Sequence, residues 1–128
     1  MKTIKDEIVD FKLALLLEKK GFPQGTSAIF YFRDEDNNNR TITTIEKALA
    51  MNIKTLDAPS HQRVIKWLRE VYNIHLMPEI KISNGIVWQT SIIKFNDSAY
   101  AVIEEGGIYK SYEASLSNAI KAVLEKYI

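Results

Sequence analysis

The spacing of the apolar residues changes at residue 73, and this change limits the possible folds more than any other feature. In SHQRVIKWLREVYN, residues 60–73, apolar side chains recur every three to four positions and cover one side of a helical wheel. From Ile74 to Ile82 they alternate with polar ones, which is the period of a half-buried strand. The sequence therefore predicts an amphipathic helix followed directly by a strand. The predicted buried side of the helix consists of His61, Val64, Ile65, Trp67, Leu68, Val71 and Tyr72.

A meander of strands and a closing helix follow. Ser83-Asn84-Gly85 is typical of a tight hairpin turn, because Asn and Gly tolerate positive φ. Residues 86–95 alternate again, residues 99–104 form a third predicted strand that ends at Gly106-Gly107, and residues 112–127 carry a helical apolar stripe behind the capping residue Ser111. Pro78 indicates that the first strand lies at an edge or is bulged there. The predicted order from residue 60 onward is α-β-β-β-α.

The first 59 residues carry weaker patterns. Apolar spacing predicts a helix over residues 3–20, with Thr3 as its N-cap and Gly21 beyond its end. SAIFYFR, residues 27–33, predicts a strand that residues 41–45 could pair with. TIEKALAMN, residues 44–52, is compatible with a short helix, and residues 56–59 are predicted to form a connection.

Length and composition favour one compact α+β domain over residues 1–128, with helices packed on one face of an antiparallel meander sheet. The chain has 128 residues, of which 46% are hydrophobic and none is cysteine. The lack of cysteine excludes disulfides and favours the cytoplasm. No apolar run is long enough to cross a bilayer, and a formal net charge of +1 gives no overall attraction to nucleic acid or to anionic membrane. We therefore expect no membrane association.

Known catalytic and metal-binding patterns are not found. Asp34, Asp36 and Asn38 alternate as in a calcium loop, but Asn39 and Ile45 stand where that loop needs Gly and Glu. His61 and His75 lack a metal-binding spacing, and we expect them to be capping or surface residues. The adjacent Glu104 and Glu105 would point to opposite faces of a strand and could not act as an acid–base pair. We therefore expect no catalytic residue, no metal, no cofactor and no enzymatic activity.

Three segments resemble small uncharacterised proteins of prophage and phage-like elements of Bacteroidetes. The segments are KLALLLEKKGF, APSHQRVIKWLREVYNIHL and YKSYEASLSNAIKAVLEKYI. In those proteins a Q-x-x-x-x-WLRE-x-x-NIH-like block precedes a strand meander, and a YEEALE-like helix closes the chain. The DEDNNN and TIEKALAMN stretches have no counterpart. The resemblance implies a phage-associated domain of unknown function and supplies no catalytic residues.

Two functions from different classes fit these features. The first is an accessory protein that binds a host or phage protein, because aromatic residues dominate interface energetics. Its candidate interaction residues are Trp67, Trp88, Tyr109 and Tyr112, and ordinary packing in the core is the alternative for each of them. The interrupted edge strand at Pro78 also suggests a homodimer through sheet or helix faces. The alternative is nucleic-acid binding, since α-β-β-β-α is also the order of double-stranded-RNA-binding domains; its predicted phosphate contacts are Arg63, Lys66 and Arg69. Against that alternative, the closing helix begins with Glu113 where a phosphate-binding domain needs lysines.

Overall fold

A computed structural model describes residues 7–25, 27, 29–33, 39–42, 55–82, 84–95 and 99–128. The chain divides into two compact units, Met1–Ser60 and His61–Ile128, and each is described by itself. The predicted α+β class is confirmed: helices accompany two separate antiparallel sheets of three strands each. The single domain over residues 1–128 stays a prediction. Among the described residues, no helix is long and apolar enough to cross a membrane.

The helix predicted over residues 3–20 is interrupted at residues 8–10. Helix α2 spans Phe11–Lys19, and Asp10 is its N-cap, whose side chain accepts a hydrogen bond from the Leu13 nitrogen at 2.8 Å. Just before it, Ile8 forms an isolated β-bridge with Ser60. A continuous helix from Thr3 is therefore wrong, because the backbone is extended at residue 8; residues 3–6 themselves lie outside the described part.

The strands of the first unit form a small sheet with the order β2-β1-β3. Strand β1 (Phe30–Arg33) is the predicted strand, shortened at its start, and it pairs antiparallel with β2 (Asn39–Ile42). Strand β3 (Thr55–Asp57) pairs with the other side of β1, so the prediction of a plain connection over residues 56–59 is wrong in part. The buried Asp57 carboxylate fixes this strand, since it accepts hydrogen bonds from the Gly25 and Ser27 nitrogens. The calcium-like residues 34–38 and the predicted helix over 44–52 lie outside the described residues.

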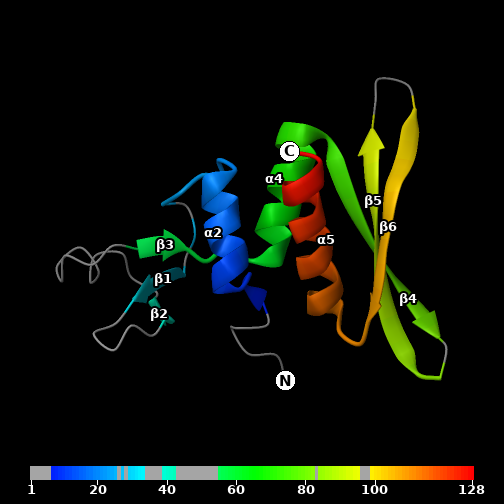
Figure 1. Cartoon of the computed structure of the whole chain (residues 1–128), viewed down its shortest axis with the longest axis horizontal. Coiled ribbons are helices and arrows are strands. Elements are labelled where there is room, and N and C mark those ends of the chain that lie inside the picture. Colours follow the sequence, from blue (N-terminus) through cyan, green and yellow to red (C-terminus); the bar gives the residue numbers. More distant parts are fainter. Residues whose placement is uncertain are drawn as a thin grey trace. The chain divides into compact units, whose positions relative to one another are not determined.

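The second unit has the predicted α-β-β-β-α order. It comprises α4 (His61–Tyr72), β4 (Ile74–Ile82), β5 (Ile86–Phe95), β6 (Tyr100–Tyr109) and α5 (Tyr112–Lys126). Figure 1 shows α4 and α5 side by side next to the sheet β4-β5-β6. Asn73, at a left-handed φ of 58°, joins α4 to β4, and its side-chain amide donates to the Phe95 carbonyl at 2.6 Å. The turn residues Asn84 and Gly85 also have positive φ, as predicted.

The two faces of this sheet follow from its register. Partners across an antiparallel pair lie on the same face, so Leu76 shares a face with its partner Ile92. This face carries the helices, because Thr90 Oγ1 lies 2.6 Å from Ser115 Oγ of α5. Together with Ile74, these side chains are buried and form the core with the apolar stripe of α5: Leu116, Ala119, Ile120, Val123 and Leu124. Ser111 caps α5 as predicted, accepting from the Ala114 nitrogen at 3.0 Å.

Strand β6 is longer than predicted. Gly106-Gly107 was expected to end it, but the strand continues to Tyr109 through two irregularities in its pairing with β5. The first lies at this glycine pair and the second at Ile103, each adding one residue to β6. A side chain on Gly106 would place its Cβ 2.7 Å from the Thr90 backbone oxygen. Glycine thus permits a close approach of β6 to β5 and allows the strand to bend without ending.

Helix α4 buries a narrower side than predicted. His61, Val64 and Leu68 are buried, whereas Ile65, Trp67 and Tyr72 are half-buried. Val71 was predicted to be buried but is 59% exposed, and it lies in the last turn of the helix, one residue before its end at Tyr72. The burial of His61 confirms its place on the predicted buried side and contradicts the expectation of a capping or surface histidine, since its Nε2 lies 2.7 Å from Ser117 Oγ of α5. That contact links the two helices where α4 begins.

Candidate functional surfaces of the sheet

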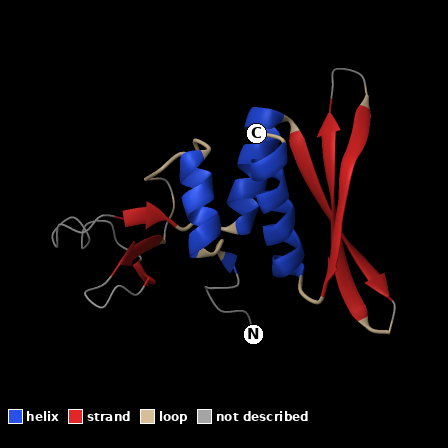
Figure 2. Cartoon of the chain, viewed as in Figure 1, coloured by secondary structure: helices blue, strands red, loops and turns tan. Residues whose placement is uncertain are grey.

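The face of the sheet away from the helices is unusually apolar. An antiparallel sheet with one solvated face normally carries polar side chains there. Here an aromatic row crosses all three strands: the His75 ring lies 4.4 Å from the Phe95 ring, which lies 5.6 Å from the Tyr100 ring. In Figure 2 the helices of this unit lie on one side of the strands only. We call this surface the open face, and its exposed apolar members are Met77, Phe95, Tyr100, Val102 and Ile108.

Ile93 occupies the centre of the open face. Its register partners are His75 on β4 and Val102 on β6, so it lies between them and is buried. The charged residues on the same face are Glu79 and Lys81 of β4 and Glu105 of β6, all exposed. The open face therefore has an apolar end, where β5 meets β6, and an opposite end with charges of both signs.

A second apolar surface lies on the helix side of the sheet, around the β4–β5 turn. Ile82 pairs with Ile86 and Ile80 with Trp88, so these four side chains share a face. The three isoleucines are exposed, Ile82 by 82%, because no described part of α4 or α5 buries them. The Trp88 ring meets the Tyr112 ring edge-on at 5.0 Å. We call this group the hairpin surface; its members are Ile80, Ile82, Ile86, Trp88, Tyr109 and Tyr112.

The structure brings three of the four predicted interaction residues together. Tyr109 is the register partner of Trp88, and the Tyr112 ring contacts the Trp88 indole edge-on. The Tyr112 hydroxyl accepts a hydrogen bond from the Gln62 side chain at 3.0 Å, which fixes the ring against α4. Trp67 lies apart on α4, where its ring meets Tyr72 edge-on at 5.3 Å. All four side chains are half-buried.

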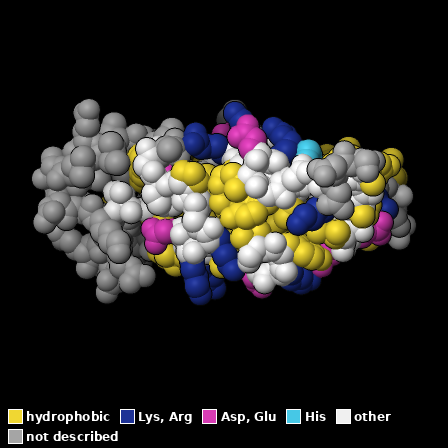
Figure 3. Space-filling model, turned by 90° about the horizontal axis from the view of Figure 1, so that it is seen from above, with side chains coloured by type: hydrophobic (Ala, Val, Ile, Leu, Met, Phe, Trp, Pro, Cys, Tyr) yellow, Lys and Arg dark blue, Asp and Glu magenta, His cyan; other side chains and the backbone are white. Residues whose placement is uncertain are grey.

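Strands β4, β5 and β6 expose hydrophobic side chains on the surface of the second unit. Figure 3 shows yellow hydrophobic side chains in its right-hand part, where the strands lie, with charged side chains of both signs between them. Soluble monomers rarely expose apolar patches larger than a few hundred Å² unless the patch binds something. The concentration of exposed apolar side chains on this one sheet makes it the leading candidate for a binding surface.

The edges of the sheet are poorly suited to adding a further strand. The Phe95 nitrogen donates to the Asn73 carbonyl at 3.2 Å, which identifies these residues as a hydrogen-bonded pair. Backbone N–H and C=O groups alternate between the two sides of a strand, so the odd-numbered residues of β4 bond to β5. The even-numbered residues direct their backbone N–H and C=O groups to the free edge. Pro78 is one of them, so its missing N–H costs the sheet nothing and interrupts the edge, as predicted. On the other edge, the two bulges of β6 interrupt the regular pattern.

The predicted phosphate contacts lie on the solvent side of α4. Arg63, Lys66 and Arg69 are all exposed. Lys66 pairs with Glu70 one turn later at 3.8 Å, and this contact neutralises part of the basic surface. At the other helix, Lys126 binds Glu104 at 2.7 Å and Lys121 pairs with Glu125 at 3.8 Å. The unpaired positive charge on this unit is therefore modest.

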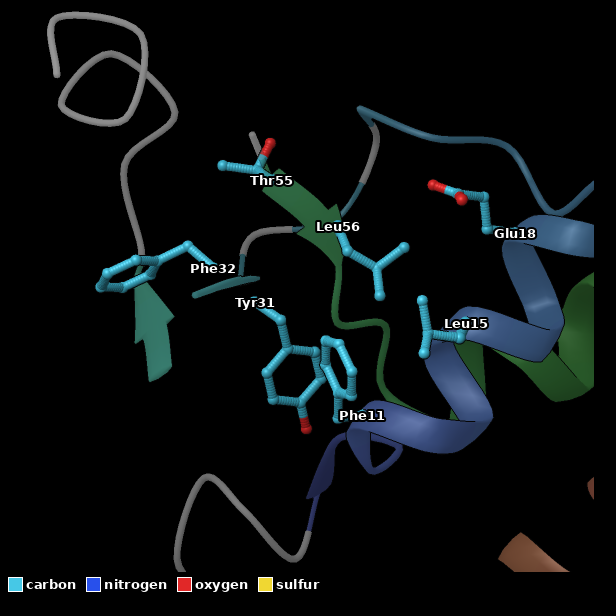
Figure 4. A pocket seen from close by; sticks show the side chains of 7 residues that line it. All are labelled: Phe11, Leu15, Glu18, Tyr31, Phe32, Thr55 and Leu56. Carbon is cyan, nitrogen blue, oxygen red and sulfur yellow. The ribbon is translucent and has the colours of Figure 1, made fainter. Parts of the chain in front are cut away.

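A pocket of about 340 Å³ lies in the first unit, between α2 and the small sheet. Figure 4 shows the side chains that line it: Phe11, Leu15, Glu18, Tyr31, Phe32, Thr55 and Leu56. Tyr31 meets Phe11 edge-on at 5.6 Å and donates its hydroxyl proton to the Val9 carbonyl at 2.6 Å. Burial, followed by the nearby Asp10 charge, raises the pKa of Tyr31 above its usual value. Glu18 is the one charged side chain in this lining, so the pocket suits an apolar group better than a phosphate.

The His61–Ser117 contact has the spacing of a base beside a nucleophile. Hydrolysis by such a pair also needs an oriented histidine and donors for the oxyanion. His61 is buried at the start of α4, and Ser117 lies within the middle of α5, so the contact joins two packed helices instead of opening to substrate. Among the described residues, no group of three or more His, Cys, Asp or Glu side chains could hold a metal ion.

Sequence reasoning did not single out the open face or the three isoleucines of the hairpin surface. Their alternation was visible, but it assigns residues to a face without showing which positions a helix covers. One signal for the open face was available in the sequence. The solvated face of a strand is expected to carry polar side chains, and Ile93 and Phe95 are apolar at such positions. Comparison with known protein families, curated proteins and solved structures finds no match.

Proposed function

We propose that this protein is a non-enzymatic, phage-related accessory protein that binds another protein through the hairpin surface. The observation that carries the proposal is the exposed cluster in which Ile80, Ile82 and Ile86 extend the Trp88–Tyr112 pair. A rigid aromatic anchor beside exposed aliphatic side chains is the composition that protein interfaces favour. The phage relation rests on the sequence resemblance, and the lack of cysteine fits a reducing cytoplasm.

The chemistry of the hairpin surface defines the partner's surface. None of its six members is charged, so the complementary surface presents apolar side chains that fill the space beside Trp88. The edge-on packing with Tyr112 and the Gln62–Tyr112 hydrogen bond hold the anchor in place before binding. A pre-formed anchor lowers the entropy lost on association. The interrupted edges favour binding to a face of the sheet over addition of a strand.

The test compares wild type with Ile82→Lys in affinity capture from a bacterial lysate, with and without nuclease. Ile82 is 82% exposed, so the fold should tolerate lysine. Val71→Lys is the matched control, since Val71 is an exposed apolar residue of α4 outside the hairpin surface. We expect a nuclease-resistant protein partner that Ile82→Lys binds at least about tenfold more weakly and Val71→Lys binds normally.

Lysine makes this test selective, because an added positive charge would not weaken binding to nucleic acid. Equal capture by wild type and Ile82→Lys would refute the hairpin surface as the binding site. Loss of the captured protein on nuclease treatment would instead make nucleic acid the ligand.

Nucleic-acid binding remains the second candidate, favoured by the α-β-β-β-α order and the three exposed bases of α4. If those bases contact phosphates, replacing Arg63, Lys66 and Arg69 with Ala should abolish a salt-sensitive shift of RNA or DNA without unfolding the protein. Under the protein-binding proposal the same triple variant captures its partner as wild type does.

A further inference from the structure

We propose that the pocket between α2 and the small sheet binds a small organic amine, whose apolar body lies against the apolar lining and whose ammonium group pairs with Glu18. The pocket belongs to the first unit, Met1–Ser60, whereas the hairpin surface belongs to the second. The proposal therefore goes beyond the binding function above and does not depend on it.

The first argument is that α2 carries a second apolar stripe. Its buried side consists of Leu13, Ala14 and Leu17. Phe11 and Leu15 lie four residues apart on another side of the helix, so they are neighbours along its surface. Both line the pocket, and Leu15 remains 44% exposed. One wall of the pocket is thus built from apolar side chains that the core of this unit leaves accessible.

Strands β1 and β3 supply the opposite wall. Tyr31 and Leu56 are register partners and therefore share a face of the small sheet. Figure 4 shows both side chains directed toward α2, whereas Phe32 and Thr55, the next pair in register, extend away from it. The Tyr31 ring is held by its edge-on contact with Phe11, and Leu56 is buried. These walls exist without a ligand, as is usual for small-molecule sites.

The second argument is the charge of the lining. Glu18 follows Leu15 by one helical turn, is exposed, and is the one charged residue of the lining. Among the residues that the structure describes, its carboxylate takes part in no ion pair or hydrogen bond. The Tyr31 hydroxyl already donates its proton to the Val9 carbonyl. A ligand that complements this lining therefore has one positive charge and an otherwise apolar body.

The third argument is the size of the pocket. Its volume of about 340 Å³ lies near the lower end of the range of roughly 300–1,000 Å³ that ligand sites cover. The same volume of liquid water holds roughly ten molecules, so one ring with a short aminoalkyl chain is a suitable occupant. A nucleotide would bring phosphates, which Glu18 repels.

The test is a titration of the isotope-labelled full chain with phenethylamine at neutral pH, where the amine is protonated, followed by amide chemical shifts. Phenethyl alcohol is the neutral control of the same shape, and hydrocinnamate is the anionic one. We expect the amine to shift amides of α2, β1 and β3 with a dissociation constant below about 10 mM, and to bind more tightly than the alcohol or the acid. Absence of a saturable shift at about 10 mM amine would overturn the proposal, as would an alcohol or acid that binds as tightly.

Variants locate the site within the first unit. Glu18→Gln should weaken amine binding at least about threefold, which is the size of a partly exposed ion pair, and should leave alcohol binding unchanged. Leu15→Trp fills the pocket from an exposed position and should abolish binding of both compounds. Glu7→Gln is the matched control, since Glu7 is an exposed acid of the same unit outside the lining. Amine affinity that Glu18→Gln leaves unchanged, or that Glu7→Gln lowers as much, contradicts the proposal.

Discussion

The two faces of the sheet β4-β5-β6 are both rich in apolar side chains but differ in what covers them. On the helix side, Ile74, Leu76 and Ile92 are buried beneath α4 and α5. On the open face, Tyr100, Val102 and Ile108 are exposed. Burial within the chain means that the first group stabilises the fold. Exposure of the second group means that water already contacts its side chains in the folded chain, so the comparison separates side chains that stabilise the fold from side chains that contribute little to it.

The largest expected loss of stability comes from the covered face, which is the side of the sheet beneath α4 and α5. Ile92→Ala removes a fully buried side chain and should lower the free energy of unfolding by about 2–5 kcal/mol. Ile108→Ala on the open face should change it by less than about 0.5 kcal/mol, because water already contacts that side chain. Urea denaturation measures both changes in the free energy of unfolding. Similar losses for the two variants would contradict the distinction between the faces.

A substitution in the glycine pair of β6 should give the next largest loss of stability. Gly106→Ala places a methyl group 2.7 Å from the Thr90 backbone oxygen, so the strands must shift, at a cost of roughly 1–3 kcal/mol. Gly107→Ala is the matched control, since the nearest atoms to its Cβ would be those of the Tyr109 ring, at 3.4 Å. Thermal unfolding of the two variants should therefore differ. Equal melting temperatures would show that the strands do not approach as closely as described.

The polar contact between the covered face and α5 gives a smaller effect. Thr90→Val keeps the shape of the side chain but leaves the buried Ser115 hydroxyl without this partner, which should cost at least about 1 kcal/mol. Adding Ser115→Ala to Thr90→Val should recover part of the lost stability, because this second substitution removes the hydroxyl that has lost its hydrogen-bond partner. A double variant no better than the sum of the two single losses would argue against a direct hydrogen bond.

His75 on the open face should give the smallest effect. Partial burial, followed by the nearby Arg69 charge, lowers the pKa of His75 below its usual value. The unfolded chain therefore binds the proton more readily, so stability is complete above the unfolded pKa of about 6.5 and falls as pH decreases below it. Solvent screening keeps the effect small. His75→Gln should make the free energy of unfolding in urea depend less on pH between about pH 5 and 7. An unchanged pH dependence would mean that other titrating groups cause it.

Much of the second unit could be predicted from the sequence because its patterns are long and unambiguous. Helix α4 and strands β4 and β5 end within a residue or two of their predicted bounds, since the apolar period changes sharply at Asn73 and Asn84-Gly85 supplies the turn. The predicted third strand is too short, because a glycine pair is typical of a turn. In the structure the same pair permits a bulge and β6 continues to Tyr109. The three-residue β3 is too short to show a period.

The candidate surfaces could be predicted only as individual residues. Trp88, Tyr109 and Tyr112 were chosen for their aromatic character, and pairing across strands brings them together. That Ile80, Ile82 and Ile86 are exposed depends on where the helices end, which alternation along a strand does not encode. The His61–Ser117 contact joins residues 56 positions apart, a separation at which no local pattern gives information.

The most direct test of the difference between the two faces is thiol labelling, because the chain has no cysteine of its own. Val102→Cys places a single thiol on the open face, where Val102 is 51% exposed, and Ile92→Cys places one on the helix side, where Ile92 is fully buried. In the native protein we expect a thiol reagent to label Val102→Cys at least about tenfold faster than Ile92→Cys, and unfolding in urea should remove the difference. Equal labelling rates in the native protein would contradict the claim that the helices cover one face of the sheet and leave the other open.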